Sequence, residues 1–159
     1  APWRMEYLVC EKQEGCVFCK CSTRCDDYVL FEGKNCFIIL NRYPYVNGHL
    51  MIIPQRHLGG LEELTAEERT EIFDLLDVSV KVLKEAMKPD GFNVGMNLGK
   101  AAGAGIAEHV HMHVIPRWQG DTNFMTVVGN VRVVPEDLAV TAARLIPLFE
   151  KYTRGGEKR

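Results

Sequence analysis

A single long amphipathic segment, residues 66–88, lies among short β-prone segments and constrains the fold more than any other feature. Thr65 and Glu68 have the spacing of a capping box at its start, and Pro89 and Gly91 end it. Its apolar residues recur at helical spacing and form one stripe, which consists of Ile72, Leu76, Val80, Leu83 and Met87. We therefore predict one helix of about six turns whose stripe packs in the core.

Five short β-prone segments flank this helix, three before it and two after it. They comprise residues 28–31, 36–40, about 49–53, 92–97 and the stretch EHVHMHVIPRW, with shorter pieces at 126–128 and 131–134. A second helix is predicted from Pro135, at a first helical position, to about Tyr152. Because strands and helices do not alternate, this order predicts an α+β fold with an antiparallel sheet of about five strands. Residues 1–159 are short enough for a single domain.

Charge and composition argue against several classes of function. The formal net charge is −2, and no basic cluster is longer than the GGEKR tail, so a dedicated nucleic-acid surface is not expected. No apolar run approaches the roughly 20 residues of a membrane span. The chain begins with APWRMEYLVC, which is unlike a secretion signal. We therefore predict a cytoplasmic protein whose six cysteines are reduced or bind metal.

Three histidines alternate with apolar residues in EHVHMHVIPRW. Successive side chains of a strand point to opposite faces, so His109, His111 and His113 would share one face. The residues between them would face the core. A strand face seldom carries three imidazoles without a polar task, which indicates a functional role, either metal binding or nucleophilic catalysis.

The N-terminal region contains CVFCKCSTRC, in which Cys16 and Cys19 form a C-x-x-C pair. A zinc site needs four nitrogen or sulfur ligands, so two more must come from elsewhere. Histidines could supply them, or Cys21 and Cys25 could complete an all-cysteine site. The remaining two cysteines, Cys10 and Cys36, are interpreted as packing residues or surface thiols.

The stretch NLGKAAGAG precedes the histidines and is rich in glycine and alanine. Such a loop lets backbone N–H groups approach phosphate oxygens closely, although it can equally be a simple turn. A neighbouring histidine nucleophile favours the phosphate-binding interpretation.

The motif HVHMHVI resembles the His-φ-His-φ-His-φ-φ signature of the histidine triad (HIT) superfamily of nucleotide hydrolases and transferases. CFIILNRYPYVNGHLMIIPQRHLGGLEEL is similar to the strand–turn–strand segment of that family, and CVFC to the cysteine pair of many bacterial members. AGAGIAEH and PRWQGDTNFM most resemble the branch that contains bacterial diadenosine tetraphosphate phosphorylases. The resemblance covers a core of about residues 16–118 and leaves residues 119–159 as a C-terminal extension with a helix.

The resemblance implies a catalytic role for three histidines. His111 would be the nucleophile that attacks the α-phosphate of a nucleotide and forms a nucleotidyl-histidine intermediate, and His113 would stabilise the developing charge. His49 would be a further group on the phosphate side. The same resemblance implies an α+β fold whose sheet pairs across a homodimer.

Nucleotide contacts are also implied, with one departure from the family. Asn41 matches the position that holds the ribose hydroxyls, and Asn97 matches a polar residue that faces the phosphates. Many members carry a polar pair before the first histidine, where this chain has Gly105 and Ile106. The contact to the leaving group must then come from Lys100 or from backbone N–H groups of the loop, such as those of Gly103 and Gly105.

In bacterial HIT proteins and in galactose-1-phosphate uridylyltransferases, a structural zinc joins two cysteines and two histidines. Carried over by position, these ligands are Cys16, Cys19, His57 and His109. The first histidine of the triad would thus brace the neighbouring nucleophile.

Three functions remain open from the sequence. The first is a nucleotidyl-transfer enzyme that acts on dinucleoside polyphosphates or nucleoside phosphoramidates, with water or phosphate as the acceptor. The second is a metal-dependent hydrolase that uses the three histidines as ligands, which the scarcity of nearby carboxylates, Glu108 and Asp121, disfavours. The third is a non-catalytic nucleotide-binding module.

Overall fold

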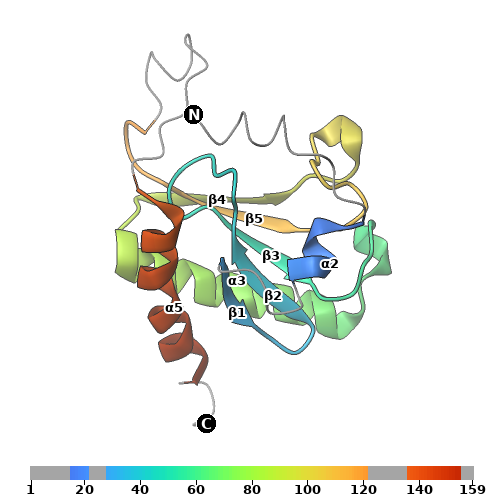
Figure 1. Cartoon of the computed structure of the whole chain (residues 1–159), viewed down its shortest axis with the longest axis horizontal. Helices are drawn as coiled ribbons and strands as arrows, with labels where there is room; N and C mark the ends of the chain where they lie inside the picture. Colours follow the sequence, from blue (N-terminus) through green and yellow to red (C-terminus); the bar gives the residue numbers. More distant parts are fainter. Residues whose placement is uncertain (1–14, 22–27, 122–135, 155–159) are drawn as a thin grey trace.

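Five antiparallel strands form one open sheet in the order β1-β2-β3-β5-β4 (Figure 1). The computed structural model describes residues 15–21, 28–121 and 136–154. The strands are β1 (Val29–Glu32), β2 (Cys36–Leu40), β3 (Leu50–Pro54), β4 (Gly91–Met96) and β5 (Met112–Arg117). The helices are α2 (Val17–Cys21), α3 (Ala66–Met87) and α5 (Leu138–Arg154), with 3-10 turns η1 (Leu61–Glu63) and η2 (Lys100–Ala102). The predicted α+β fold with an antiparallel sheet is confirmed.

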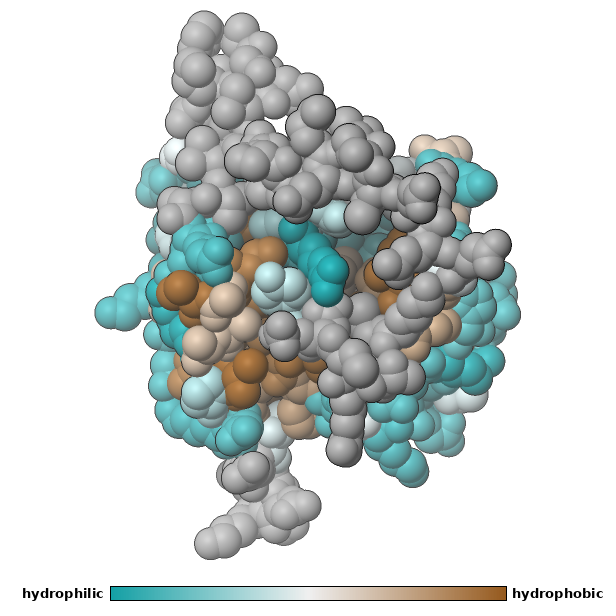
Figure 2. All heavy atoms as spheres, in the orientation of Figure 1, coloured by the Kyte–Doolittle hydropathy of each residue, from teal (hydrophilic) through white to brown (hydrophobic). Residues whose placement is uncertain are grey.

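The two faces of the sheet carry different layers. Helix α3 lies behind the sheet and packs beside α5, whereas α2 lies in front of it (Figure 1). In β2 and β3, alternate side chains enter the main core on the α3 side, as Ile38 and Ile52 do. The other side chains of these two strands pack with Phe18 of α2. We call this smaller group the α2-side cluster, which consists of Phe18, Phe37, Ile39, Met51 and Ile53. On the side of the molecule that Figure 2 shows, apolar side chains also gather beside α5.

The predicted histidine strand begins later than expected. Strand β5 starts at Met112, because its ladder with β3 runs only from Val114, opposite Leu50, to Met112, opposite Ile52. Before this point the chain is held by other bonds, such as that from the Val110 N–H to the Leu58 carbonyl, at 2.8 Å. The alternation of side chains nevertheless persists, since Val110, Met112 and Val114 are all buried in the main core. The histidines between them therefore face the α2 side.

The third strand and the two long helices also differ slightly from the prediction. Strand β3 starts at Leu50 and not at His49, whose N–H bonds to Val46 in the preceding turn. Helix α5 starts at Leu138, and the predicted first position at Pro135 lies outside the described residues, as do the β-prone pieces at 126–128 and 131–134. None of the helices among the described residues has the length and apolarity needed to cross a membrane.

The capping box of α3 forms as predicted, but the buried face is rotated from the predicted stripe. The Glu68 N–H donates to the Thr65 hydroxyl, and the Thr65 N–H donates to the Glu68 carboxylate at 2.8 Å. Val80 is only half-buried. The fully buried residues of the helix are Glu68, Ile72, Leu75, Ser79, Val82 and Leu83. Ser79 fits in this row because its hydroxyl donates to the Leu75 carbonyl at 2.7 Å.

Glu71 of α3 stabilises the turn between β1 and β2. Its carboxylate accepts the Asn35 N–H at 2.9 Å, the Asn35 side-chain amide at 2.7 Å and the Cys36 N–H at 3.3 Å. We expect Glu71→Gln to cost about 1–3 kcal/mol, since several donors lose a charged acceptor. That corresponds to a fall in Tm of roughly 2–12 °C, measured by calorimetry. The exposed Asp74→Asn on the same helix is the control, and an unchanged Tm in Glu71→Gln would contradict this account.

Candidate functional site

Three imidazoles form a row on the α2 side of the sheet. The ring centroids of His111 and His113 are 4.8 Å apart, and those of His113 and His49 are 5.0 Å apart. His49 is fully buried, and 5% of His111 is exposed. His113 comes from β5, and the other two residues directly precede β5 and β3. The pairing of these two strands therefore brings together side chains that are 62 or more positions apart in the sequence.

The hydrogen bond of His111 fixes which of its nitrogens can react. Its Nδ1 lies 2.9 Å from the His109 carbonyl oxygen, which can only accept, so Nδ1 carries the proton. The lone pair is thus on Nε2. Burial lowers the pKa of His111 below its ordinary value, which favours the neutral ring. A neutral imidazole with a free Nε2 lone pair is a competent nucleophile.

A chain of hydrogen bonds likewise orients His49 and His113. The Tyr45 N–H donates to His49 Nδ1 at 3.2 Å, so the proton of this ring lies on Nε2. His49 Nε2 is 2.9 Å from His113 Nδ1, to which it donates. His113 therefore carries its own proton on Nε2 and presents it as a donor. A row that offers one lone pair and one N–H donor suits a phosphoryl group.

His113 is expected to remain neutral well into the acid range. Burial, and then the proximity of His111, lower the pKa of His113 to about 4. We expect ¹H–¹⁵N correlation spectra to show its ring protonating near that pH, and protonation at the ordinary value of about 6.5 would contradict the buried geometry. The unfolded chain binds the proton first as pH falls. The contribution of His113 to the free energy of unfolding is therefore full above about pH 6.5 and declines toward pH 4.

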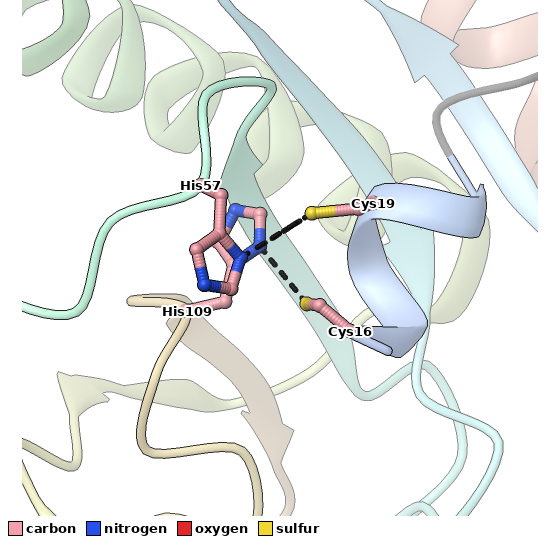
Figure 3. A group of neighbouring side chains, drawn as sticks. All are labelled: Cys16, Cys19, His57 and His109. Carbon is pink, nitrogen blue, oxygen red and sulfur yellow. Dashed lines mark hydrogen bonds between the residues drawn. The ribbon is translucent and has the colours of Figure 1, made fainter. Parts of the chain in front are cut away.

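Four side chains converge beside α2 to form a possible metal site (Figure 3). The site consists of Cys16, Cys19, His57 and His109. The ligand atoms all lie within 4.8 Å of one another. The two cysteines come from α2 and the residue before it, and the histidines come from the segments after β3 and before β5. The described residues thus assemble the ligand set with two cysteines and two histidines. Cys25 and the side chain of Cys21, which the all-cysteine alternative needs, lie outside them, and so does Cys10.

The distances in this group fit a tetrahedral ion. His109 Nδ1 is 3.2 Å from Cys16 Sγ and 3.6 Å from Cys19 Sγ, and His57 Nδ1 is 3.3 Å from Cys19 Sγ. Nitrogen and sulfur ligands of one tetrahedral zinc are about 3.5 Å apart. His109 Nε2 donates to the Pro54 carbonyl at 2.8 Å, which leaves the Nδ1 lone pair facing the sulfurs. The donor set and its orientation therefore fit zinc.

Cys36 lies apart from these four residues, and its thiol is expected to be unreactive. It is fully buried in the main core, where burial and then the charges of Glu71 and Glu68 raise its pKa to about 12. This confirms the interpretation of Cys36 as a packing residue, since a protonated buried thiol is unreactive.

The predicted nucleotide-binding residues fall into two places. The Asn41 side chain contacts the histidine row, with Nδ2 at 3.3 Å from His49 Nδ1. The others belong to the loop from β4 to His109, namely Asn97, Lys100, Gly103 and Gly105. Within that loop Asn97 Nδ2 lies 3.4 Å from the Gly103 carbonyl, Lys100 is exposed, and Gly105 has open space around it. Because β4 and β5 pair Met96 with Met112, the loop starts level with His111.

Two aromatic contacts were not expected from the sequence. Phe18 packs edge-on against His111, with ring centroids 5.0 Å apart, and Tyr45 stacks on His49 at 5.1 Å. The only sequence signal for Phe18 was its place between the two cysteines. Ile106, at the position of the missing polar pair, packs against the α2-side cluster.

Comparisons with known proteins agree with this geometry. Residues 22–120 match the HIT domain family. An AP-4-A phosphorylase of Mycobacterium tuberculosis is 46% identical over 113 residues, which are 71% of this chain and 58% of that protein. A bis(5'-adenosyl)-triphosphatase of Dictyostelium discoideum is 32% identical over 129 residues, which are 77% of this chain and 86% of that protein. This chain thus spans little more than half the length of the mycobacterial relative.

The fold resembles that of a solved structure with the same kind of histidine motif. A Zn-bound histidine triad family protein from Mycobacterium smegmatis superposes with a TM-score of 0.73 at 27% sequence identity. The superposition covers 89% of this chain and 97% of that one.

Proposed function

The chain belongs to the HIT domain family, and on that premise we propose that it is a nucleotidyl-transferring enzyme that cleaves dinucleoside polyphosphates of the diadenosine tetraphosphate type. Orthophosphate is the proposed acceptor, because a relative at 46% identity is an AP-4-A phosphorylase. The observation that carries the proposal is the buried His111, whose Nδ1–H is bound to the His109 carbonyl.

In the first step, His111 Nε2 attacks the α-phosphorus of the substrate. A P–N bond forms as the bond to the bridging oxygen breaks, and the nucleoside polyphosphate leaves with that electron pair. The nucleotide remains on His111, which carries a positive charge that the His109 carbonyl stabilises through Nδ1–H. In the second step an oxygen of phosphate attacks the same phosphorus and releases a nucleoside diphosphate. Two displacements thus replace one difficult displacement.

His113 and His49 support the charge on the phosphoryl group. His113 Nε2–H donates to a nonbridging oxygen, where negative charge develops in the transition state. His49 keeps this proton on Nε2 of His113, since it occupies Nδ1 at 2.9 Å. Neither ring needs to gain or lose a proton for this role.

The rest of the substrate is proposed to lie along Asn41 and the loop from β4 to His109. Asn41 holds the ribose hydroxyls, and Asn97 faces the phosphates. The Lys100 ammonium and the backbone N–H groups at Gly103 and Gly105 contact the leaving polyphosphate. The apolar Ile106 makes the backbone and Lys100 the available donors at this point.

Zinc is the proposed occupant of the site formed by Cys16, Cys19, His57 and His109, where two thiolates would balance the charge of the ion and two imidazole nitrogens would complete its coordination. When bound, it braces the fold and does not contact substrate. His109 thereby places the carbonyl that orients His111. One domain, residues 1–159, is proposed to carry out this function. The cytoplasmic location stays a prediction.

We further propose that a second copy of the chain pairs along β4. This strand is at one edge of the described sheet, and Val94 on it is 44% exposed. An apolar groove runs beside this strand toward α3. Its lining includes Phe73 of α3, which is 64% exposed, and Leu98 of the loop after β4, which is 48% exposed. Edge strands and apolar grooves of this kind pair readily with a second copy.

Replacing Val94 with lysine is expected to convert a dimer into a monomer, since it places charges on both sides of the paired edge. Sedimentation velocity at micromolar concentration measures the change. Val140→Lys is the matched control, because Val140 is 53% exposed but lies on α5. A monomeric wild-type protein, or dissociation by the control alone, would show that β4 is not the interface.

Product analysis tests the proposed function. The protein is incubated with diadenosine tetraphosphate with and without orthophosphate, and products are separated by ion-exchange chromatography. ADP and ATP that appear only with phosphate support phosphorolysis, whereas AMP and ATP indicate that water is the acceptor and contradict it. Turnover that is lost on chelation and restored by metal, without an enzyme-bound nucleotide, would favour a metal-dependent hydrolase. Tight binding without any turnover would favour a binding module.

A further inference from the structure

The two residues between the metal-binding cysteines differ sharply in their exposure to solvent. Val17 is 50% exposed, whereas Phe18 is 4% exposed and inserts into the α2-side cluster. Phe37 and Met51 of the sheet are among its partners there. The turn that carries the two thiols therefore also anchors one aromatic ring on the active-site face.

This ring touches the nucleophile as well as a metal ligand. The Phe18 centroid is 5.0 Å from that of His111, with an interplanar angle of 62°, and 5.6 Å from that of His109, at 87°. These edge-to-face arrangements are favourable and directional. His111 also meets the ring of His113, with centroids 4.8 Å apart. A single hydrogen bond at Nδ1 leaves an imidazole free to tilt, so the contacts with these two rings hold its plane.

The position of Phe18 depends in turn on the metal-binding residues. Helix α2 has only five residues, which is too short to be stable alone. Its anchors are the buried Phe18 side chain and the two cysteines, which face His57 and His109. Loss of the contacts among these four metal-binding residues would release α2. The Phe18 ring that packs on His111 would then be released as well.

We propose that Phe18 is a positioning residue that couples the metal-binding turn to the nucleophile His111. The turn acts on His111 by two routes, through the Phe18 ring and through the His109 carbonyl that accepts from Nδ1. The proposal rests on the proposed function for its kinetic consequence, but its structural part does not depend on any substrate.

The first test uses the zinc-loaded full chain without substrate. Long-range ¹H–¹⁵N correlation spectra report the tautomer of each histidine ring. We expect one tautomer for His111, protonated on Nδ1, in the wild type and in the exposed control Val17→Ala. Phe18→Ala is expected to keep one zinc per chain but to give His111 a mixture of tautomers. An unchanged His111 signal in zinc-loaded Phe18→Ala would overturn the proposal.

The second test separates binding from chemistry. We expect Phe18→Ala to lower kcat by about 10- to 100-fold, as misplacement of a reacting group does. A rise in KM with kcat unchanged would overturn the positioning role, because it would mean that Phe18 only contributes uniform binding energy. Val17→Ala should change neither constant.

A conservative variant covers the case in which Phe18→Ala loses zinc or fails to fold. Phe18→Leu keeps the apolar volume in the cluster and should bind zinc fully, with a kcat between those of the wild type and the alanine variant. A wild-type kcat and a single His111 tautomer in zinc-loaded Phe18→Leu would overturn a role for the ring. If the wild type shows no turnover on any nucleotide, the proposed function fails, and the tautomer spectra still decide whether Phe18 positions His111.

Discussion

Replacing His111 with asparagine is expected to lower kcat by about 10⁴-fold or more, because the proposed covalent intermediate forms on this ring. Asparagine retains a polar side chain of similar reach but has no nucleophilic nitrogen. We expect little change in the Tm or the zinc content, since the metal ligands and the core contacts of Val110 and Met112 are untouched. Steady-state release of ADP and ATP measures the loss.

Glu108→Gln is the matched control for this variant. Glu108 is exposed and is one of the two carboxylates nearest the triad in the sequence. Nucleotidyl transfer through His111 predicts wild-type kcat in Glu108→Gln, whereas a metal-dependent hydrolase with a carboxylate base predicts a loss. Full activity of His111→Asn would end the proposed mechanism.

Removing one metal ligand is expected to have the second large effect. Cys16→Ser or His57→Asn should abolish stoichiometric zinc binding, because the ion loses a ligand of its closed tetrahedral site. Zinc present at 100 to 1,000 times its Kd stabilises the folded chain by about 3–4 kcal/mol. A fall in Tm of roughly 6–16 °C therefore follows, with a parallel fall in kcat. Calorimetry and atomic absorption measure the two changes.

Cys21→Ser and Cys25→Ser are the controls, because they test the alternative all-cysteine site. The site with two cysteines and two histidines predicts that both keep one zinc per chain and the wild-type Tm. If these variants lose zinc while His57→Asn retains it, the ligand set is wrong. If the purified wild type contains no tightly bound metal, the zinc proposal itself is wrong.

Patterns of local spacing predicted much of this fold. Two features could be predicted because each depends only on neighbouring residues. They are the capping box at Thr65 and Glu68 and the alternation of Val110, Met112 and Val114. The start of β5 could not be predicted, because it depends on where the ladder with β3 ends. Likewise, Val80 was placed on the buried stripe of α3, but the buried face is set by the position of the sheet and α5.

The candidate site was predictable by residue type but not by contact. The five histidines and the cysteine pair stood out because their chemistry is rare in such a pattern. The tautomers of His111 and His113 required the carbonyl of His109 and the ring of His49, which only the folded chain brings near. The contact of Phe18 with His111 could not be predicted, since nothing in the sequence links two residues that are 93 positions apart.

The covalent intermediate is the central claim, and rapid-quench mass spectrometry tests it most directly. The protein is mixed with diadenosine tetraphosphate without phosphate and quenched in alkali, where a phosphoramidate bond survives. We predict a chain that is heavier by one adenylyl group, carried on the peptide with His111 and absent from His111→Asn. Turnover that proceeds with no adduct at any quench time, or with an adduct on another residue, would contradict the account.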